Sequence, residues 1–168
     1  MRYPKTIRRA DKSEYADVDR CFHLTIRAHP EVHRFAPAVA EVVWRSVVQQ
    51  RELPHVELHA ACLMPDHVHL LISPRERDVV AFVRTWKSWT TRLAREAGHS
   101  LPLWQPGMWD RTCRDEGDFQ ATAAYIVQNP VAAGLVDDAT EWPHTWAFWL
   151  ESRRPPPPPS TPQPPPPP

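Results

Sequence analysis

Two histidines separated by one aliphatic residue are the feature of this sequence with the most evident chemistry. They lie in residues 64–71, which read MPDHVHLL. Successive side chains of a β-strand alternate between its faces, so His67 and His69 would share one face while Val68 and Leu70 share the other. Two imidazoles side by side supply half of a metal site. The aliphatic residues between them would anchor the strand in a core.

Three interpretations of the histidine pair are open at this level. A zinc site would need cysteines or a third histidine at short spacing, and none is placed for that. The pair could also be purely structural and hydrogen-bonded at a sheet surface. A Mg²⁺ or Mn²⁺ site for phosphate chemistry would need a further oxygen ligand and a nucleophile nearby.

Hydrophobic periodicity indicates the elements that must position these histidines. Pro130 disfavours helical geometry at the residue before it. The helix that begins near residue 119 is therefore expected to stop or kink there, with Asn129 capping a new turn. The pattern predicts strands at 21–28, 55–63, 67–73 and from about 108, and helices at 37–51, 77–97 and from 119 to 128.

The order of these elements predicts the fold class. The first six follow the order β-α-β-β-α-β of the ferredoxin-like, split βαβ arrangement. We therefore expect an α+β fold: a four-stranded antiparallel sheet with helices on one face, plus a C-terminal helix that bears Tyr125. The first and third strands are central neighbours in this topology. The polar face of the first strand, with His23, Thr25 and Arg27, would then lie beside the histidine pair.

Composition predicts one folded domain between two irregular ends. Residues 1–19 are polar without periodicity and are expected to form an irregular arm. Residues 20–150 are of single-domain size, and the 42% hydrophobic content and eight tryptophans of the chain indicate a well-filled core. Residues 151–168 include eleven prolines from position 155 onward, which predicts a disordered, polyproline-like tail.

Charge and cysteine content limit the location and the partners of the protein. No apolar run is long enough to span a bilayer, and no signal peptide is visible. Three widely spaced cysteines indicate reduced thiols, so we expect a cytoplasmic protein with no membrane partner. The net charge is zero, yet residues 75–114 hold eight Lys or Arg against four Asp or Glu. Such a basic region is compatible with a phosphate-bearing partner, although charge segregation is common on soluble surfaces.

A second motif follows the histidine stretch about 55 residues later, where residues 125–136 read YIVQNPVAAGLV. The two motifs together resemble the single-tyrosine HUH transposases, and more narrowly the REP-associated tyrosine transposases. The resemblance covers roughly residues 20–146. It departs from the family pattern at Ala132 and Ala133, where a basic residue is frequent, and in the proline tail. It also takes in HLTIR at 23–27, LWQ at 103–105, DR at 110–111 and RD at 114–115.

The resemblance implies roles for individual residues. His67 and His69 would hold a divalent cation, Mg²⁺ or Mn²⁺, and Tyr125 would be the nucleophile. Asn129 would be a third ligand, and positions i and i+4 do share a helix face. An aromatic on an amphipathic helix is more often core, and Asn129 would equally suit a helix cap. His23 and Arg27 would lie behind the metal ligands.

The function implied by the resemblance is that of a metal-dependent, single-stranded DNA endonuclease and strand transferase. It would cleave near hairpin-forming, REP-like repeats through a 5′-phosphotyrosine, with DNA hairpins as partners, no small-molecule substrate, and a monomeric or homodimeric state. The alternatives are an inactive hairpin-binding protein of the same ancestry and a metal-binding structural domain unrelated to DNA. Residues expected to contact DNA, unless they form only a solvated face, are Arg84, Lys87, Arg92, Arg95, Trp104, Arg111 and Arg114.

Overall fold

The structure is a computed structural model that describes residues 10–150. The predicted proline-rich tail and residues 1–9 of the predicted arm lie outside the described residues. The strands are β1 (Phe22–Arg27), β2 (Val56–Leu63), β3 (His67–Pro74), β4 (Trp109–Thr112) and β5 (Thr145–Ala147). The helices are α1 (Pro37–Gln49), α2 (Val79–Glu96) and α3 (Glu116–Ala132), with short 3₁₀ helices η1 (Glu14–Ala16) and η2 (Ala139–Glu141).

The strands form one antiparallel sheet in the order β4-β1-β3-β2-β5. The predicted fold class is confirmed, and β1 and β3 are central neighbours as the split βαβ topology requires. The sheet has one strand more than expected, because Thr145–Ala147 pairs with the outer edge of β2. A three-residue strand has too short a pattern to be recognised in the sequence, and its pairing depends on a partner more than 80 residues away.

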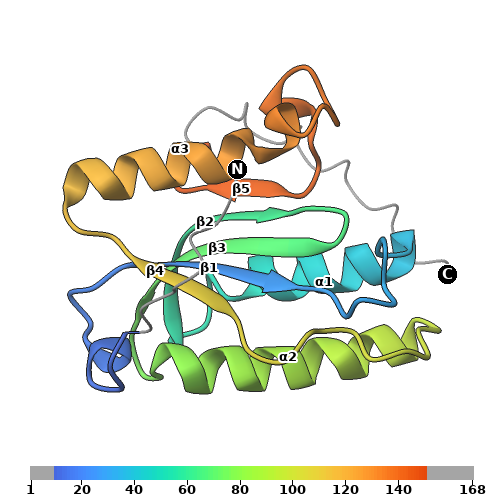
Figure 1. The fold of residues 1–168 in the computed structure, drawn as a ribbon, viewed down its shortest axis with the longest axis horizontal. Coiled ribbons are helices and arrows are strands. Elements are labelled where there is room, and N and C mark those ends of the chain that lie inside the picture. The colour runs from blue at the N-terminus through green and yellow to red at the C-terminus, as the bar shows by residue number, and fades with distance from the viewer. Residues whose placement is uncertain (1–9, 151–168) are drawn as a thin grey trace, which may run out of the picture.

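The helices cover opposite faces of the sheet (Figure 1), with α1 and α2 on one side and α3 on the other. The alternation of β1 explains this division. Leu24 and Ile26 belong to the core under α1 and α2, whereas His23 and Thr25 point toward α3. Each face has its own hydrophobic core, and the smaller one joins α3 to β2 and β5. The polar face of β1 is therefore enclosed by the third helix.

Helix α3 continues through Pro130, so of the two expected outcomes, a stop or a kink, the stop was wrong. Proline removes one backbone donor, but the helix ends only two residues later, so few bonds remain to be lost. Pro130 is itself buried in the packing of α3. Asn129 is accordingly an interior residue of the helix and not a cap. Its side-chain Nδ2 donates a hydrogen bond to the main-chain carbonyl of Tyr125 at 2.8 Å.

The described part of the N-terminal arm packs on the domain. Tyr15, in η1, is 6% exposed, and its hydroxyl donates a hydrogen bond to Oδ2 of Asp110 at 2.8 Å. Its ring also lies against Phe22, with centroids 5.5 Å apart. Apart from η1, residues 10–19 are irregular, and one aromatic side chain secures them to β1 and β4.

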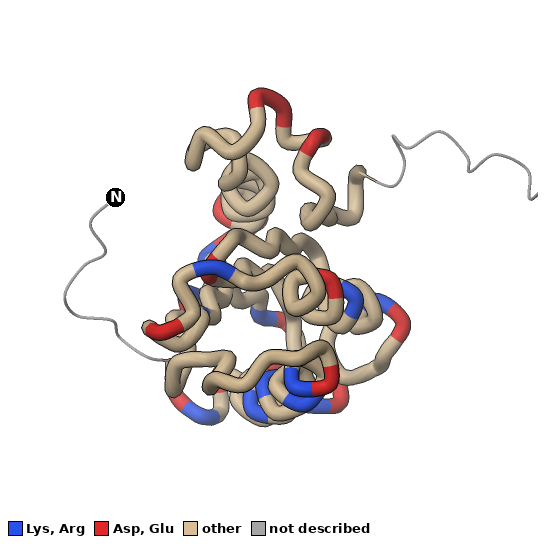
Figure 2. The backbone as a smooth tube through the Cα atoms, turned by 90° about the vertical axis from the view of Figure 1, so that its right-hand side faces the viewer, with Lys and Arg blue, Asp and Glu red and all other residues tan. Residues whose placement is uncertain are grey.

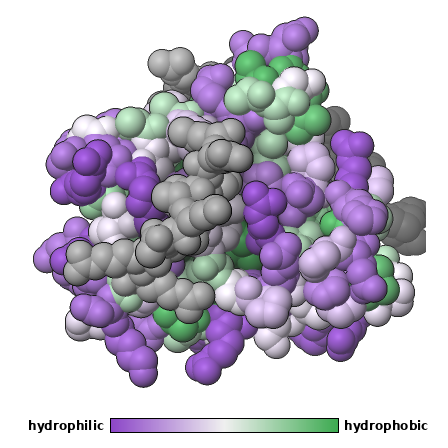
Figure 3. Space-filling view, in the orientation of Figure 1, coloured by the Kyte–Doolittle hydropathy of each residue, from purple (hydrophilic) through white to green (hydrophobic). Residues whose placement is uncertain are grey.

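The surface is divided by charge. Figure 2 shows Lys and Arg gathered along α2, while the loop after α3 carries only acidic charges, Asp137, Asp138 and Glu141. The face drawn in Figure 3 is mostly hydrophilic, with a small hydrophobic cluster at its upper edge over the end of α3. No helix within residues 10–150 has the length and apolar content needed to cross a membrane.

Candidate active site

The histidine pair converges on one point. Nε2 of His67 lies 3.1 Å from Nε2 of His69, and the two rings are nearly perpendicular, with centroids 4.8 Å apart. Two nitrogens bound to one cation at about 2.1 Å each lie about 3 Å apart when the angle between them is 90°. The spacing therefore suits two neighbouring ligands of a single metal ion.

Hydrogen bonds orient both rings from behind. Nδ1 of His67 lies 2.6 Å from Oδ1 of Asp66, and Arg27 forms an ion pair with the other oxygen of that carboxylate at 3.9 Å. Nδ1 of His69 lies 3.0 Å from Nε2 of His23 and 3.1 Å from the hydroxyl of Thr25. If each Nδ1 carries the proton, both Nε2 atoms present lone pairs, which is the usual arrangement behind metal-bound histidines.

Burial keeps these rings neutral. It is the largest influence on all three: it lowers the pKa of His69 to about 2 and that of His23 to about 4, and it also lowers the pKa of His67. For His69, the neighbouring His67, His23 and Arg27 add to this effect. Neutral imidazole is the form that binds metals, so the pair is ready to bind a cation at neutral pH.

The metal-free protein should lose stability as the pH falls below about 6.5. The unfolded chain takes up protons at histidine near that value, whereas folded His23 and His69 stay neutral until much lower pH. The stability that these neutral histidines contribute is therefore complete above pH 6.5, and it declines as the pH falls from 6.5 toward their folded pKa values. At pH 5, His69 alone should contribute a loss of about 2 kcal/mol relative to pH 7.5. Urea titrations with a chelator at both pH values measure this. If the free energy of unfolding of His69→Gln fell just as steeply with pH, the loss could not be assigned to His69.

Tyr125 lies over the histidines. Its ring centroid is 5.9 Å from those of His23 and His69, and both contacts are edge-on. The side chain is 39% exposed, so the phenol borders solvent instead of the core, while its neighbour Ile126 is fully buried. Ile126 anchors α3 in the smaller core, and the residue before it faces the polar side of β1. The structure thus brings together a tyrosine and the histidine pair that lie more than 50 residues apart in the sequence.

Asn129 lies one turn after Tyr125 on α3. Figure 1 shows α3 running antiparallel to β3, so later residues of the helix lie toward the start of β3, where His67 is found. Its amide nitrogen is engaged with the Tyr125 carbonyl, which leaves Oδ1 as its candidate ligand atom. Among residues 10–150, no three or more His, Cys, Asp or Glu side chains are grouped to hold a metal. Further ligands would have to be amide, phosphate or water oxygens, which Mg²⁺ and Mn²⁺ accept.

Comparison with known proteins places the chain in a family. A family model described as "Transposase IS200 like" matches residues 18–129. The chain belongs to the IS200-like transposase family. The match spans β1 to the second half of α3, and so includes both histidines and Tyr125.

The IS200-like chain is similar to REP-associated tyrosine transposases. A Haemophilus influenzae protein provisionally given that name is 30% identical over 103 residues, 53% of this chain and 57% of its own length. The Escherichia coli K12 protein of that name is 29% identical over 87 residues, 52% of each. The chain thus spans little more than half the length of these relatives. A solved structure is described as a REP-associated tyrosine transposase bound to a REP hairpin. It matches with a TM-score of 0.67 and 20% sequence identity, over 90% of this chain and 87% of its own chain, which establishes the shared fold.

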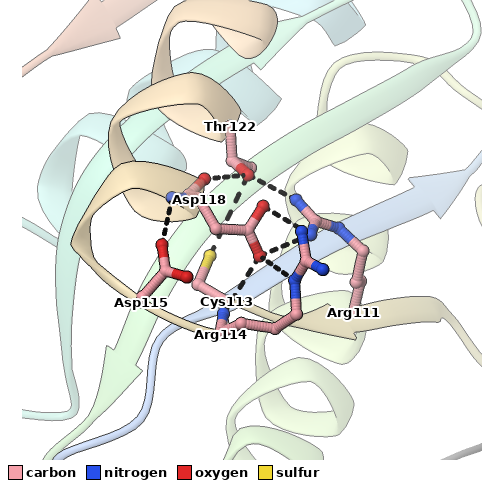
Figure 4. Close-up of polar contacts among 6 residues, drawn as sticks. All are labelled: Arg111, Cys113, Arg114, Asp115, Asp118 and Thr122. Carbon is pink, nitrogen blue, oxygen red and sulfur yellow. Dashed lines mark hydrogen bonds and ion pairs between the residues drawn. The ribbon is translucent and has the colours of Figure 1, made fainter.

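An ion-pair clamp attaches α3, the helix that bears Tyr125, to β4 (Figure 4). Nη1 of Arg111 donates to both oxygens of Asp118 at 2.8 Å, and Nη2 donates to the hydroxyl of Thr122. The main-chain N–H of Arg114 donates to the same carboxylate at 3.0 Å, and Asp115 caps the helix by accepting from the Asp118 N–H. Arg111, above all, lowers the pKa of Asp118 to about 2. Arg111 was expected to contact DNA, but its guanidinium is committed to α3.

Removing the clamp should destabilise the protein. Asp118→Ala leaves Arg111 and the Arg114 N–H without their carboxylate, so we expect the free energy of unfolding to fall by about 2 kcal/mol. Urea denaturation followed by circular dichroism measures this. Asp137→Ala, at an exposed acidic position beyond α3, is the matched control and should change stability by less than about 0.5 kcal/mol. Equal losses in the two variants would contradict the clamp.

The basic residues predicted on α2 gather at a groove on the other face of the sheet. The groove has a volume of about 860 Å³ and lies between α2 and residues 102–108. Lys87 is partly occupied there, because its Nζ donates to the main-chain carbonyls of Gln105 at 2.6 Å and of Gly107. The four predicted cations all line it: Arg84, Lys87, Arg92 and Arg95.

Trp104 also borders the groove, but it is only 8% exposed. Its ring packs against Trp86 and Phe35, and its Nε1 donates to Thr90 at 2.8 Å. Little of the ring is therefore available for stacking on a base, contrary to its expected role. Trp109 is better placed, because it is half-buried and lies edge-on to His23 with centroids 5.3 Å apart.

Sequence patterns missed several residues that shape the site. Asp66, which lies between the predicted strands 55–63 and 67–73, was given no role, although metal-binding histidines usually donate their second ring N–H to a carboxylate or a carbonyl. Asp118 and Thr122 were also given no role in the site. Their spacing of four residues indicated a shared helix face, but not which partner that face would meet.

Proposed function

We propose that this chain is a metal-dependent, single-stranded DNA endonuclease and strand transferase that acts beside hairpin-forming repeats. The observation that carries the proposal is the position of the Tyr125 ring over His69, whose Nε2 converges with that of His67. A nucleophile and a candidate cation site thus share one surface. The hairpin in the solved structure of similar fold supports the substrate class.

The chemistry follows from these placements. The hydroxyl oxygen of Tyr125 would attack the scissile phosphorus; the new bond is O–P, and the bond to the 3′-oxygen breaks. The phenolic proton passes to solvent, and the leaving 3′-oxygen is protonated, which gives a 5′-phosphotyrosine and a free 3′-hydroxyl. A bound divalent cation would offset charge on a non-bridging phosphate oxygen. Attack by another 3′-hydroxyl on the phosphotyrosine would join strands and release Tyr125.

One chain supplies the whole proposed centre. Tyr125 contacts the histidines of its own chain, and the Arg111 clamp fixes α3 on its own β4. No residue from a second copy is required for the contacts between tyrosine and histidine. We therefore infer that a monomer is competent for cleavage, and that the initial rate per protein molecule does not depend on protein concentration.

The α2 groove is the second part of the proposed DNA site. It lies on the opposite face of the sheet from Tyr125, so one phosphate cannot contact both. The groove reaches Asp110 in β4 and Met108 just before it, and β4 is an edge strand. DNA that contacts both surfaces would pass around this edge, next to Trp109 and the exposed Arg114. Aromatic stacking and phosphate contacts along such a path are typical of single-strand binding.

Neutralising the groove should weaken DNA binding without affecting the fold. The double variant Arg84→Ala/Arg95→Ala removes two exposed cations. We expect the affinity for a single-stranded hairpin to fall about tenfold. The slope of log affinity against log salt concentration should become shallower by about one for each lost phosphate contact. Fluorescence anisotropy at several salt concentrations measures both. Arg45→Ala, at an exposed position of α1, is the matched control. An equal loss of affinity in this variant would exclude a specific role for the groove.

Incubation with labelled single-stranded hairpin DNA and Mn²⁺ tests the function. A covalent protein–DNA adduct that survives denaturation would support the endonuclease. Tight binding across many hairpins without an adduct would instead support an inactive DNA-binding protein. Unfolding on chelation, with no DNA affinity, would support a structural metal site.

A further inference from the structure

Cys21 and Cys113 face each other across the ladder between β1 and β4. The register pairs Phe22 with Thr112, so the cysteines occupy the next pair of opposed positions. The main-chain N–H of Cys113 donates to the carbonyl of Cys21 at 2.8 Å. The Cα atoms of a hydrogen-bonded antiparallel pair are about 5.5 Å apart, which lies within the range that a disulfide spans.

The two thiols are free, partly exposed and in contact. Their mutual interaction is the main reason why the pKa of Cys113 is lowered and that of Cys21 is raised. The side-chain contact with Thr122 and the positive charge of Arg111 also lower the pKa of Cys113. A thiolate beside a thiol is the arrangement that redox-active cysteine pairs use. Cys62, in contrast, is fully buried.

We propose that Cys21 and Cys113 form an oxidisable dithiol site that closes to an intramolecular disulfide when the protein meets a peroxide. The Cys113 sulfur attacks one peroxide oxygen, the O–O bond breaks, and the departing hydroxide takes a proton to leave as water. The Cys21 sulfur then attacks the Cys113 sulfenic acid. The S–O bond breaks, and the hydroxyl group leaves as a second water with the Cys21 proton. The two sulfurs lose two electrons in total, and the peroxide gains them.

The disulfide would fix the free edge of the sheet. Strand β4 has four residues and pairs only with β1 in the sheet order. A covalent link at its end should slow local opening of the strand. Sγ of Cys113 also lies 4.0 Å from the hydroxyl of Thr122 (Figure 4). The disulfide would therefore form beside the Arg111–Asp118 clamp that holds α3. This proposal does not depend on the proposed DNA chemistry.

Thiol counting on the full chain tests the proposal. The reduced protein is freed of reductant, treated with hydrogen peroxide, denatured and alkylated with iodoacetamide. We expect one alkylated cysteine in place of three, a mass lower by two hydrogens before alkylation, and a peptide that joins the segments of Cys21 and Cys113. Dithiothreitol should restore all three thiols. Amide exchange across residues 109–112 should be slower in the oxidised protein.

Single variants separate the two chemical steps. Cys21→Ser should stop at the sulfenic acid of Cys113, which a 1,3-diketone reagent traps, whereas Cys113→Ser should leave Cys21 and Cys62 reduced and alkylatable. Three reactive thiols after peroxide treatment of the unaltered chain would overturn the proposal. So would a disulfide that involves Cys62 or joins two chains. Peptide mapping of the unaltered chain decides the matter even if a variant fails to fold.

Discussion

Tyr125→Phe is expected to abolish the covalent DNA adduct and to leave hairpin affinity within about twofold of the unaltered protein. The change removes one hydroxyl oxygen from a side chain that is 39% exposed, so packing of the ring against His23 and His69 should persist. The oxygen is the only atom through which this residue could bond to phosphorus. The loss should therefore be complete within detection, and denaturing gels of labelled DNA with Mn²⁺ measure it.

Tyr15→Phe provides a matched control. It also removes a tyrosine hydroxyl, but one that is buried and donates to Asp110 on the other side of the sheet. We expect this variant to lose some stability and to keep adduct formation at a temperature where it is folded. If Tyr125→Phe still formed the adduct, a different nucleophile would be at work, and the proposed mechanism would be wrong.

His67→Ala should have the second largest effect. It removes one of the two converging Nε2 atoms and leaves the Asp66–Arg27 pair without the ring that it orients. We expect at least a hundredfold slower adduct formation at fixed Mn²⁺ concentration, since even residues that only support metal ligands typically change affinity or activity 10- to 100-fold. Mn²⁺ binding followed by electron paramagnetic resonance should weaken in parallel.

His33→Ala is the control for this variant, because His33 is an exposed histidine that lies outside β3. Its adduct rate and Mn²⁺ affinity should match those of the unaltered protein. Asp66→Asn adds a graded test: a weaker acceptor behind His67 should lower Mn²⁺ affinity by less than the removal of the ring does. Unchanged Mn²⁺ binding in His67→Ala would show that the histidine pair is structural.

The histidine pair and its strand could be predicted from local patterns. Alternation with a period of two is a property of the strand alone, so it correctly put His67 and His69 on one face with Val68 on the other. The order of elements then predicted that β1 and β3 would be neighbours, because few topologies accommodate two βαβ units with short connections. His23 was placed beside His69 by this reasoning, and the structure shows the contact.

The roles of the basic and aromatic residues could not be predicted in the same way. A sequence shows that Arg111 is charged but not that Asp118 meets it, since that contact depends on how α3 docks on β4. Trp104 looked available for stacking, yet the packing of α2 against the loop encloses it. Burial and ion pairing depend on how separate elements pack against one another, even when the two residues are as close in sequence as Arg111 and Asp118, and side-chain spacing does not encode that packing.

The sequence by itself put His67 and His69 on one face of a strand, because alternation with a period of two is a local property. Tyr125 was singled out only by the resemblance to a known family. Only the tertiary structure decided that they meet. It carried α3 through Pro130 and fixed it on β4, so that Tyr125 lies over His23 and His69. The physical reason is that hydrophobic burial of Ile126 and the Arg111 ion pair set the position of the helix, and both are contacts between α3 and the face of the sheet that it covers.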